Sequence, residues 1–340
     1  MIKKPTIFRD DSEELNEIKK LAGIQIVDIV EEQLKELFEI ENPSASTNKK
    51  RDEISGDWIY YPWSKTLLHT LSEKEIFSLQ TNRNRDIITT AEQKKLAAFT
   101  IAIAGLSVGG NIATTLAYNG FSKKIKLADF DNLSTTNLNR ARAKLADVGT
   151  PKIDIIKKQL YELNPYINIT SFDDGINKKN LEVFLLGDYR SNLVFEIIDD
   201  FEMKILIRQE AKKHKIPVVM LTSIGDNILI DVERYDIDPE TKIFNGLVGE
   251  DVLEKILSGK MKEEEKNKYA VKIVGPENVP PRVMDSIKKI GKELVGRPQV
   301  MSTVTISSGL ASLVARKIAL GEPLPSGRTL IKLDDLITTK

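Results

Sequence analysis

The chain has 340 residues, of which 41% are hydrophobic and 29% are charged, the proportions of a folded globular protein with one large domain or two smaller ones. Fifty Lys and Arg residues balance fifty Asp and Glu residues, so no overall charge favours nucleic acid or an anionic membrane as a partner. The absence of cysteine excludes a disulfide, a cysteine nucleophile and a cysteine-ligated zinc site.

The first residues lack the apolar core of a signal peptide, and no run of about 18 apolar residues could cross a bilayer. We therefore expect a cytoplasmic protein with no membrane partner. The two histidines are too few for a zinc site made of imidazoles alone.

Residues 1–80 form a predicted N-terminal extension with helical and aromatic character. Residues 1–40 are predicted to be helical, because apolar residues recur there every three or four positions from Ile18 to Leu37, and the polar residues 43–50 predict a loop. The aromatic segment Trp58–Trp63 is interpreted either as a small core packed on the main domain or as a platform for a substrate peptide. A short helix is expected from Ser72, and Thr89 is expected to cap the next one.

The stretch from Phe99 to Asp131 predicts a nucleotide-binding half-fold. A continuous apolar run indicates a buried strand, a glycine-rich turn and a helix follow it, and a second strand ends in acidic residues. Glycines let the backbone approach a phosphate, and the helix N-terminus offers free N–H groups to its charge. Ser107 replaces the second glycine of the dinucleotide pattern, which weakens the case for a plain dinucleotide site.

The rest of the chain continues the alternation of strands and helices, which predicts a doubly wound, mostly parallel sheet. Strands are expected at 167–172, 193–198, 217–221, 229–235 and 329–333, and helices at 151–163, 203–214 and 307–320. The charged segment at 250–292 interrupts this pattern. It is interpreted either as a solvated helical insertion or as a mobile crossover that covers substrate.

Three charged side chains follow predicted strands at the edge where open parallel sheets bind ligands. Arg140 and Lys152 come after the second strand, and Asp199 comes after a later one. Two cations suit a triphosphate better than the diphosphate of NAD, and a carboxylate at a strand end can hold magnesium. Each residue alone could be a surface charge or a helix cap. Together they predict an ATP site.

Several motifs, in this order, resemble the ThiF/MoeB/ubiquitin-activating superfamily of ATP-dependent adenylating enzymes. The resemblance covers residues 80–235 well and 300–335 more loosely. The motifs are NRDII at 84–88, GLSVGG at 105–110, LADFD at 127–131, NLNR at 137–140, GTPK at 149–152, LNP at 163–165 and the closing helix at 309–323.

The resemblance implies a Rossmann-like adenylation domain at 81–340, with ATP and magnesium as cofactors. It implies catalytic roles for Arg85, Arg140 and Lys152, with Arg85 acting across a homodimer, and a magnesium-binding role for Asp199. Asp129 would bind the ribose. The implied nucleotide contacts are Gly105, Ser107, Gly109, Gly110, Asp129, Asp131, Asn137, Arg140 and Lys152.

The expected function is activation of a carboxylate, at the end of a peptide or small protein, as an acyl adenylate with release of pyrophosphate. Without cysteine, no thioester can form on this chain. The alternatives are an oxidoreductase that uses NAD or FAD, and a non-catalytic nucleotide-binding partner subunit. A tRNA-modifying dehydratase of the same superfamily is less favoured, because no basic stripe marks a nucleic-acid site. Residues 1–80 are expected to select the substrate, so their deletion would spare ATP binding.

Overall fold

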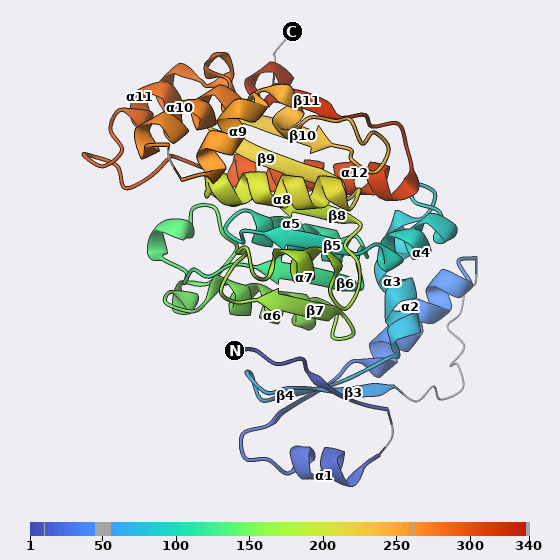
Figure 1. Ribbon diagram of the computed structural model, residues 1–340. Helices are drawn as coiled ribbons and strands as arrows, with labels where there is room; N and C mark the ends of the chain where they lie inside the picture. Colours follow the sequence, from blue (N-terminus) through green and yellow to red (C-terminus); the bar gives the residue numbers. More distant parts are fainter. Residues whose placement is uncertain (10, 45–55, 260, 338–340) are drawn as a thin grey trace.

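A seven-stranded, mostly parallel sheet forms the centre of the computed structural model, which describes residues 1–9, 11–44, 56–259 and 261–337 (Figure 1). The strand order is β11-β10-β9-β8-β5-β6-β7. Strands β5 to β9 are parallel, and β10 and β11 complete one edge as antiparallel neighbours. The doubly wound fold is confirmed. The strands are β5 (Ile101–Ala104), β6 (Lys124–Ala128), β7 (Asn168–Phe172), β8 (Leu193–Glu196), β9 (Val218–Ile224), β10 (Asn227–Glu233) and β11 (Gly327–Lys332).

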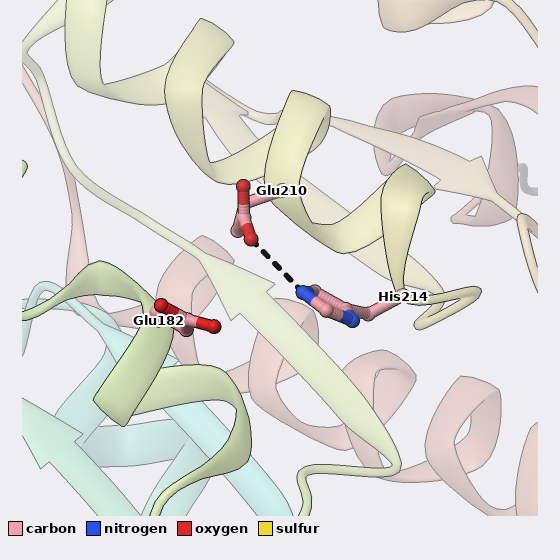
Figure 2. A group of neighbouring side chains, drawn as sticks. All are labelled: Glu182, Glu210 and His214. Atoms are coloured by element: carbon pink, nitrogen blue, oxygen red, sulfur yellow. Dashed lines mark hydrogen bonds and ion pairs between the residues drawn. The ribbon is translucent and has the colours of Figure 1, made fainter.

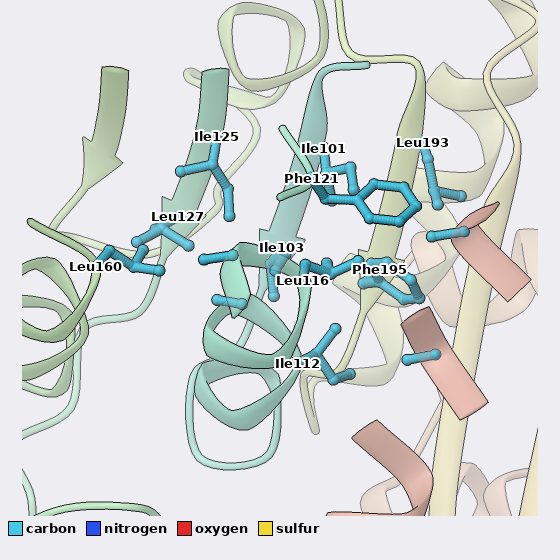
Figure 3. Packing of buried hydrophobic residues seen from close by; sticks show 14 of the residues in the cluster. Ile101, Ile103, Ile112, Leu116, Phe121, Ile125, Leu127, Leu160, Leu193 and Phe195 are labelled. Atoms are coloured by element: carbon cyan, nitrogen blue, oxygen red, sulfur yellow. The ribbon is translucent and has the colours of Figure 1, made fainter. Parts of the chain in front are cut away.

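Helices cover both faces of this sheet. One face carries α4 (Thr90–Ala98), α5 (Gly109–Tyr118), α6 (Lys152–Leu163) and α12 (Met301–Leu320), and the other carries α7 (Leu181–Leu186) and α8 (Phe201–Lys213). Figure 3 shows isoleucines and leucines of β5, β6 and β8 packed under α5. Alternate residues of β5, such as Ala102, face α7 and α8 instead, as the two-residue period of a strand requires. Helix α7 was not predicted from the sequence.

Lys126 is a charged residue buried within this sheet. It belongs to β6, its side chain is fully buried, and its ammonium donates one long bond, of 3.4 Å, to the carbonyl of Val183. Burial lowers the pKa of Lys126 to about 8, although the nearby carboxylate of Asp188 opposes this shift.

Replacing Lys126 with methionine should therefore stabilise the fold at pH 7, by about 1–2 kcal/mol, because a buried cation is exchanged for an apolar side chain of similar length. Between about pH 8 and 10.5 the folded lysine is neutral while the unfolded one still binds a proton. Wild-type stability then rises with pH and the advantage of the variant shrinks. Urea unfolding at about pH 7 and pH 10 measures this, with the exposed neighbour Lys124→Met as control. An equal gain in the free energy of unfolding for Lys126→Met and Lys124→Met at both pH values would contradict this prediction.

The N-terminal residues form a second, four-stranded sheet beside α6 and β7 (Figure 1). Its order is β1-β3-β4-β2, from β1 (Thr6–Phe8), β2 (Gln25–Asp28), β3 (Asp57–Tyr61) and β4 (Thr66–Thr70), and α1 (Glu13–Lys19), α2 (Val30–Glu41) and α3 (Glu73–Thr81) accompany it. The helical prediction for residues 1–40 was wrong at Thr6–Phe8, which pair with β3, and at Gln25–Asp28. Gly23, at φ +76°, breaks the helical path there, and the next residues pair with β4.

The aromatic segment joins this small sheet to the main domain. The hydroxyl of Tyr61 donates to the carbonyl of Tyr161 over 3.3 Å, and the indole N–H of Trp63 donates to Glu162 over 2.8 Å. Tyr61 also belongs to the buried cluster of the central sheet. The segment therefore packs on the main domain, as the first interpretation proposed. Most of the predicted loop at 43–50 lies outside the described residues.

The described part of the charged segment holds three α-helices, α9 (Glu250–Leu257), α10 (Glu263–Val274) and α11 (Pro281–Ile287), so it is largely helical. Leu253 and Ile256 of α9 pack against Ile205 of α8 and fix the insertion to the main domain. Helix α12 is long and apolar enough to cross a membrane by length and composition, but half of that stretch is buried in the fold. Its apolar residues pack in the same core as those of α5.

Candidate functional site

At the glycine turn after β5, the backbone of the turn lies close to the backbone that follows β8. Gly105 has φ +89°, and a Cβ placed there would lie 2.4 Å from the carbonyl oxygen of Ile197. A Cβ on Gly110 would lie 2.6 Å from the side chain of Ile156, so this glycine lets α5 approach α6. Among the described residues, no partner is found for the N–H groups of residues 107–109. Three consecutive amides at the start of a helix form a potential anion site.

Asp129 anchors this turn to the end of β6. One carboxylate oxygen accepts the N–H of Leu106 over 2.6 Å, and the other accepts the N–H of Asp131 over 2.8 Å. Burial raises the pKa of Asp129, while these two N–H bonds and the charge of Lys152 oppose the rise. The carboxylate keeps further lone pairs that could accept from ribose hydroxyls.

A small hollow beside the turn is lined mostly by apolar residues and also by two basic ones. Lys152 is buried at the start of α6, and its ammonium lies 2.7 Å from Asp131. Lys152 and Arg142 line the hollow together with Ser107 and Gly110. Two basic residues therefore lie near the glycine turn and its free amides, a combination that suits a phosphate group.

Arg142 is a site residue that the sequence analysis missed. Its backbone carbonyl accepts the side-chain amide of Gln159 over 2.6 Å, so the loop that carries it is held against α6. The signal that could have found it is a basic run at alternate positions. That run begins at Arg140, the last residue of the NLNR motif, and continues through Arg142 to Lys144.

Asn111 connects the glycine turn to the segment that carries Arg140. Its side-chain amide donates to the carbonyl of Ser107 over 3.3 Å and to the carbonyl of Arg140 over 2.7 Å, and the residue is buried. The guanidinium of Arg140 bonds within its own loop, to the carbonyl of Thr136 and to Asn139. Asn111 was missed from the sequence, because a polar residue inside a predicted helix gives no signal of its own.

Asn137 also bonds within this loop, where its side-chain oxygen accepts the N–H of Ser134 over 3.1 Å. Its side chain, like that of Arg140, shapes the loop that adjoins the turn. The structure thus separates the predicted nucleotide contacts into two groups. The group that meets at the glycine turn is Ser107, Asp129, Asp131 and Lys152, and the group in the adjoining loop is Asn137 and Arg140.

Asp199 lies at the same edge of the sheet, just after β8. Because β5 lies between β8 and β6, the glycine turn is flanked by Asp199 on one side and Asp129 on the other. Asp199 is 92% exposed, and one carboxylate oxygen lies 3.0 Å from Arg297. Its other oxygen has no partner among the described residues, so the carboxylate fits a magnesium ligand. The neighbouring Asp200 instead caps α8 by accepting the N–H of Met203.

A buried ionic network supports the end of β8. Glu196 and Glu233 are fully buried, and each lies 2.7 Å from the guanidinium of Arg208. Burial alone would raise the pKa of Glu196, but Lys204 and Arg208 lower it. Glu196 also accepts the N–H of Ile198, so the network fixes the backbone that leads into the magnesium-binding candidate.

Arg85 does not lie near the glycine turn of its own chain. It is exposed, and its neighbour Asn84 donates to the carbonyl of Asn119, just after the C-terminal end of α5. The glycine turn lies at the other end of this ten-residue helix, about 15 Å away. Arg85 therefore lies apart from the other predicted site residues of its own chain.

Glu182, Glu210 and His214 form a separate group on α7 and α8 (Figure 2). His214 lies 2.9 Å from Glu210, and Lys213 lies 2.9 Å from the same carboxylate oxygen. The bond from Lys213, and after it the bond from His214, lowers the pKa of Glu210 against the opposing effect of burial. Because a lysine already shares this carboxylate, we assign no metal to the group.

The sequence is similar to proteins from several bacteria. The chain is 32% identical over 332 residues to the uncharacterized protein MT1398 of Mycobacterium tuberculosis, a match that covers 96% of this chain but only 45% of that protein. The chain therefore spans less than half the length of this relative. It is 27% identical over 212 residues to tRNA threonylcarbamoyladenosine dehydratase of Bacillus subtilis, covering 62% of this chain and 79% of that protein. It is 26% identical over 223 residues to molybdopterin-synthase adenylyltransferase of Haemophilus influenzae, covering 63% and 86%.

Solved structures share the fold. PaaA superposes with a TM-score of 0.53 at 20% identity, covering 78% of this chain and 72% of that one. The Escherichia coli protein MccB, solved with ATP, superposes with a TM-score of 0.50 at 18% identity, covering 72% and 63%. The family model described as ThiF family matches residues 79–336, which include the glycine turn, both flanking acids and α12. The chain belongs to the ThiF family.

Proposed function

We propose that this chain binds ATP with magnesium and activates a carboxylate as an acyl adenylate. The observation that carries the proposal is the glycine turn with three free amides, flanked by Lys152 on one side and Asp199 on the other. An adenylyltransferase among the relatives and the ATP named with MccB support the same ligand.

In the proposed reaction a carboxylate oxygen of the substrate attacks the α-phosphorus of ATP. The bond from that phosphorus to the bridging oxygen breaks, and pyrophosphate leaves with the electron pair, so no net proton transfer is needed. Lys152 and the free amides of Ser107 and Gly109 would stabilise the charge on the phosphates. Asp129 would orient the ribose, and Asp199 would hold magnesium, which supplies further charge neutralisation.

We propose a peptide or small-protein C-terminus as the carboxylate, with residues 1–80 helping to select it. Because the chain has no cysteine, the acceptor nucleophile comes from a substrate, another residue type or a partner protein. The bonds of Tyr61 and Trp63 to α6 mean that deletion of residues 1–80 would also expose the main domain. Point substitutions on the small sheet therefore test selection more cleanly than deletion.

A tRNA-modifying dehydratase is the second candidate, favoured by the Bacillus subtilis relative of that name. In that case tRNA, and not a peptide, would stimulate the consumption of ATP. Pyrophosphate release measured with bulk tRNA and with a peptide library separates the two candidates.

We also propose a homodimer in which Arg85 reaches the phosphates bound by the partner chain. Its distance from the glycine turn of its own chain requires such an arrangement if it is catalytic. Exposed apolar side chains flank this end of α5: Ile87, Tyr118, and Leu313 next to Ser312, whose hydroxyl accepts the side-chain amide of Asn119 over 2.9 Å. These side chains are suited to burial against a second copy.

The proposal is tested by calorimetric titration of the wild type and Asp129→Ala with Mg·ATP and with NAD. We expect the wild type to bind Mg·ATP and to ignore NAD. The variant should bind Mg·ATP about 30-fold more weakly, because both the ribose contact and the two bonds that hold the turn are lost. Binding of NAD without ATP would favour the oxidoreductase, and binding of neither would favour a non-catalytic partner subunit.

A further inference from the structure

A short segment crosses the candidate site in this structure. Residues 295–300, which we call the strap, connect the turn after α11 to the start of α12. Two contacts hold it: the guanidinium of Arg297 lies 3.0 Å from Asp199, and the amide of Asn139 donates to the carbonyl of Gln299 over 2.7 Å. Residues 295–299 form no backbone-to-backbone hydrogen bond with the described part of the chain.

The sheet order fixes what the strap crosses. Asp199 follows β8, and Asn139 lies in the connection that follows β6. Strand β5 lies between β8 and β6, and its C-terminal end is the glycine turn. A segment held at Asp199 and at Asn139 therefore passes across the mouth of the turn, where the phosphates of a nucleotide would lie.

The ion pair between Arg297 and Asp199 is exposed and therefore weak. The two side chains are 64% and 92% exposed, and exposed ion pairs of this kind change an equilibrium by about fivefold at most. Such a pair is too weak to lock the site. It shows instead that the guanidinium reaches the carboxylate suited to the metal, and hence reaches any anion bound beside that metal.

We propose that Arg297 is a further ligand-binding residue of this site and binds the phosphates of the nucleotide once Asp199 is engaged by magnesium. The inference rests on the proposed function. The planar fork of a guanidinium matches two phosphate oxygens, which the ammonium of Lys152 on the far side of the turn cannot do. The sequence motifs did not single out Arg297, because it lies in an irregular segment far along the chain from the glycine turn.

The test is calorimetric titration of the full-length wild type and of Arg297→Ala, Arg297→Lys and Lys292→Ala with Mg·ATP and with adenosine. Arg297→Ala should weaken Mg·ATP binding about tenfold, as expected for the loss of a charge-assisted bond, while Arg297→Lys keeps part of the affinity. Lys292→Ala removes one exposed charge from the same connection and should change the affinity by less than about twofold. Adenosine, which lacks phosphate, should bind the wild type and Arg297→Ala alike.

The possible results distinguish a failure of the proposed function from a failure of the proposed role of Arg297. If the wild type fails to bind Mg·ATP, the proposed function fails and the inference fails with it. If the wild type binds and Arg297→Ala binds within about twofold of it, the function stands and the role of Arg297 is overturned. Tighter binding by Arg297→Ala would also overturn it, because Arg297 would then be a counter-ion that competes for Asp199. Thermal unfolding of each variant shows that the fold is kept.

Discussion

Replacing Lys152 with alanine is expected to weaken Mg·ATP binding by about 100-fold or more. Lys152 lines the hollow together with Ser107 and Gly110, and its ammonium lies 2.7 Å from Asp131. Its loss removes a charge-assisted bond to phosphate and also leaves the carboxylate of Asp131 uncompensated next to an anionic ligand. Calorimetric titration of the variant with Mg·ATP measures the effect.

Lys158→Ala is the matched control, since Lys158 belongs to the same helix and is only partly buried. It should bind Mg·ATP like the wild type. The double variant Lys152→Ala with Asp131→Asn should recover part of the lost affinity, because the repelling carboxylate is neutralised. A Lys152→Ala protein that binds Mg·ATP within about threefold of the wild type would remove this residue from the phosphate site.

Replacing Arg208 with alanine is expected to lower the free energy of unfolding by about 3–5 kcal/mol at pH 7, because two buried carboxylates lose their shared cation. Phe244, whose ring lies 4.2 Å from the guanidinium, loses a contact as well. Urea unfolding measures the loss. Lys213→Ala removes an exposed cation from the end of the same helix and should cost less than about 0.5 kcal/mol.

The deficit of Arg208→Ala should shrink as the pH falls from about 7 to 5. Without Arg208, no ion-pair partner is left for Glu233 among the described residues, so burial raises its folded-state pKa further and protonation relieves the variant as the pH falls. In the wild type the pKa of Glu196 is lowered, and stability is instead lost on acidification. Glu196 keeps its ion pair with Lys204 in the variant, so the contrast between the two proteins comes mainly from Glu233, which loses its cation. A deficit that does not change with pH would show that lost packing, and not buried charge, destabilises the variant.

The central sheet and most of its helices could be predicted from the sequence, because both signals are local. Continuous apolar runs such as Phe99–Ala104 predict strands buried on both faces, and the turn chemistry at Gly105–Gly110 requires backbone approach whatever surrounds it. The capping pair of Thr89 and Glu92 was equally local and is present as predicted. The order of the acids and cations along the chain was enough to indicate one nucleotide site.

The set of distant residues that meet at that site could be found only from the folded chain. Arg297 lies 98 positions after Asp199, so no local pattern could pair them. The split of residues 18–37 into helix and strand depended on pairing with β4, since an exposed strand such as β2 has little pattern of its own. The burial of Arg208 and Lys126 could not be predicted either. From sequence alone, charged residues are expected to be exposed to solvent, and their burial depends on how the chain packs.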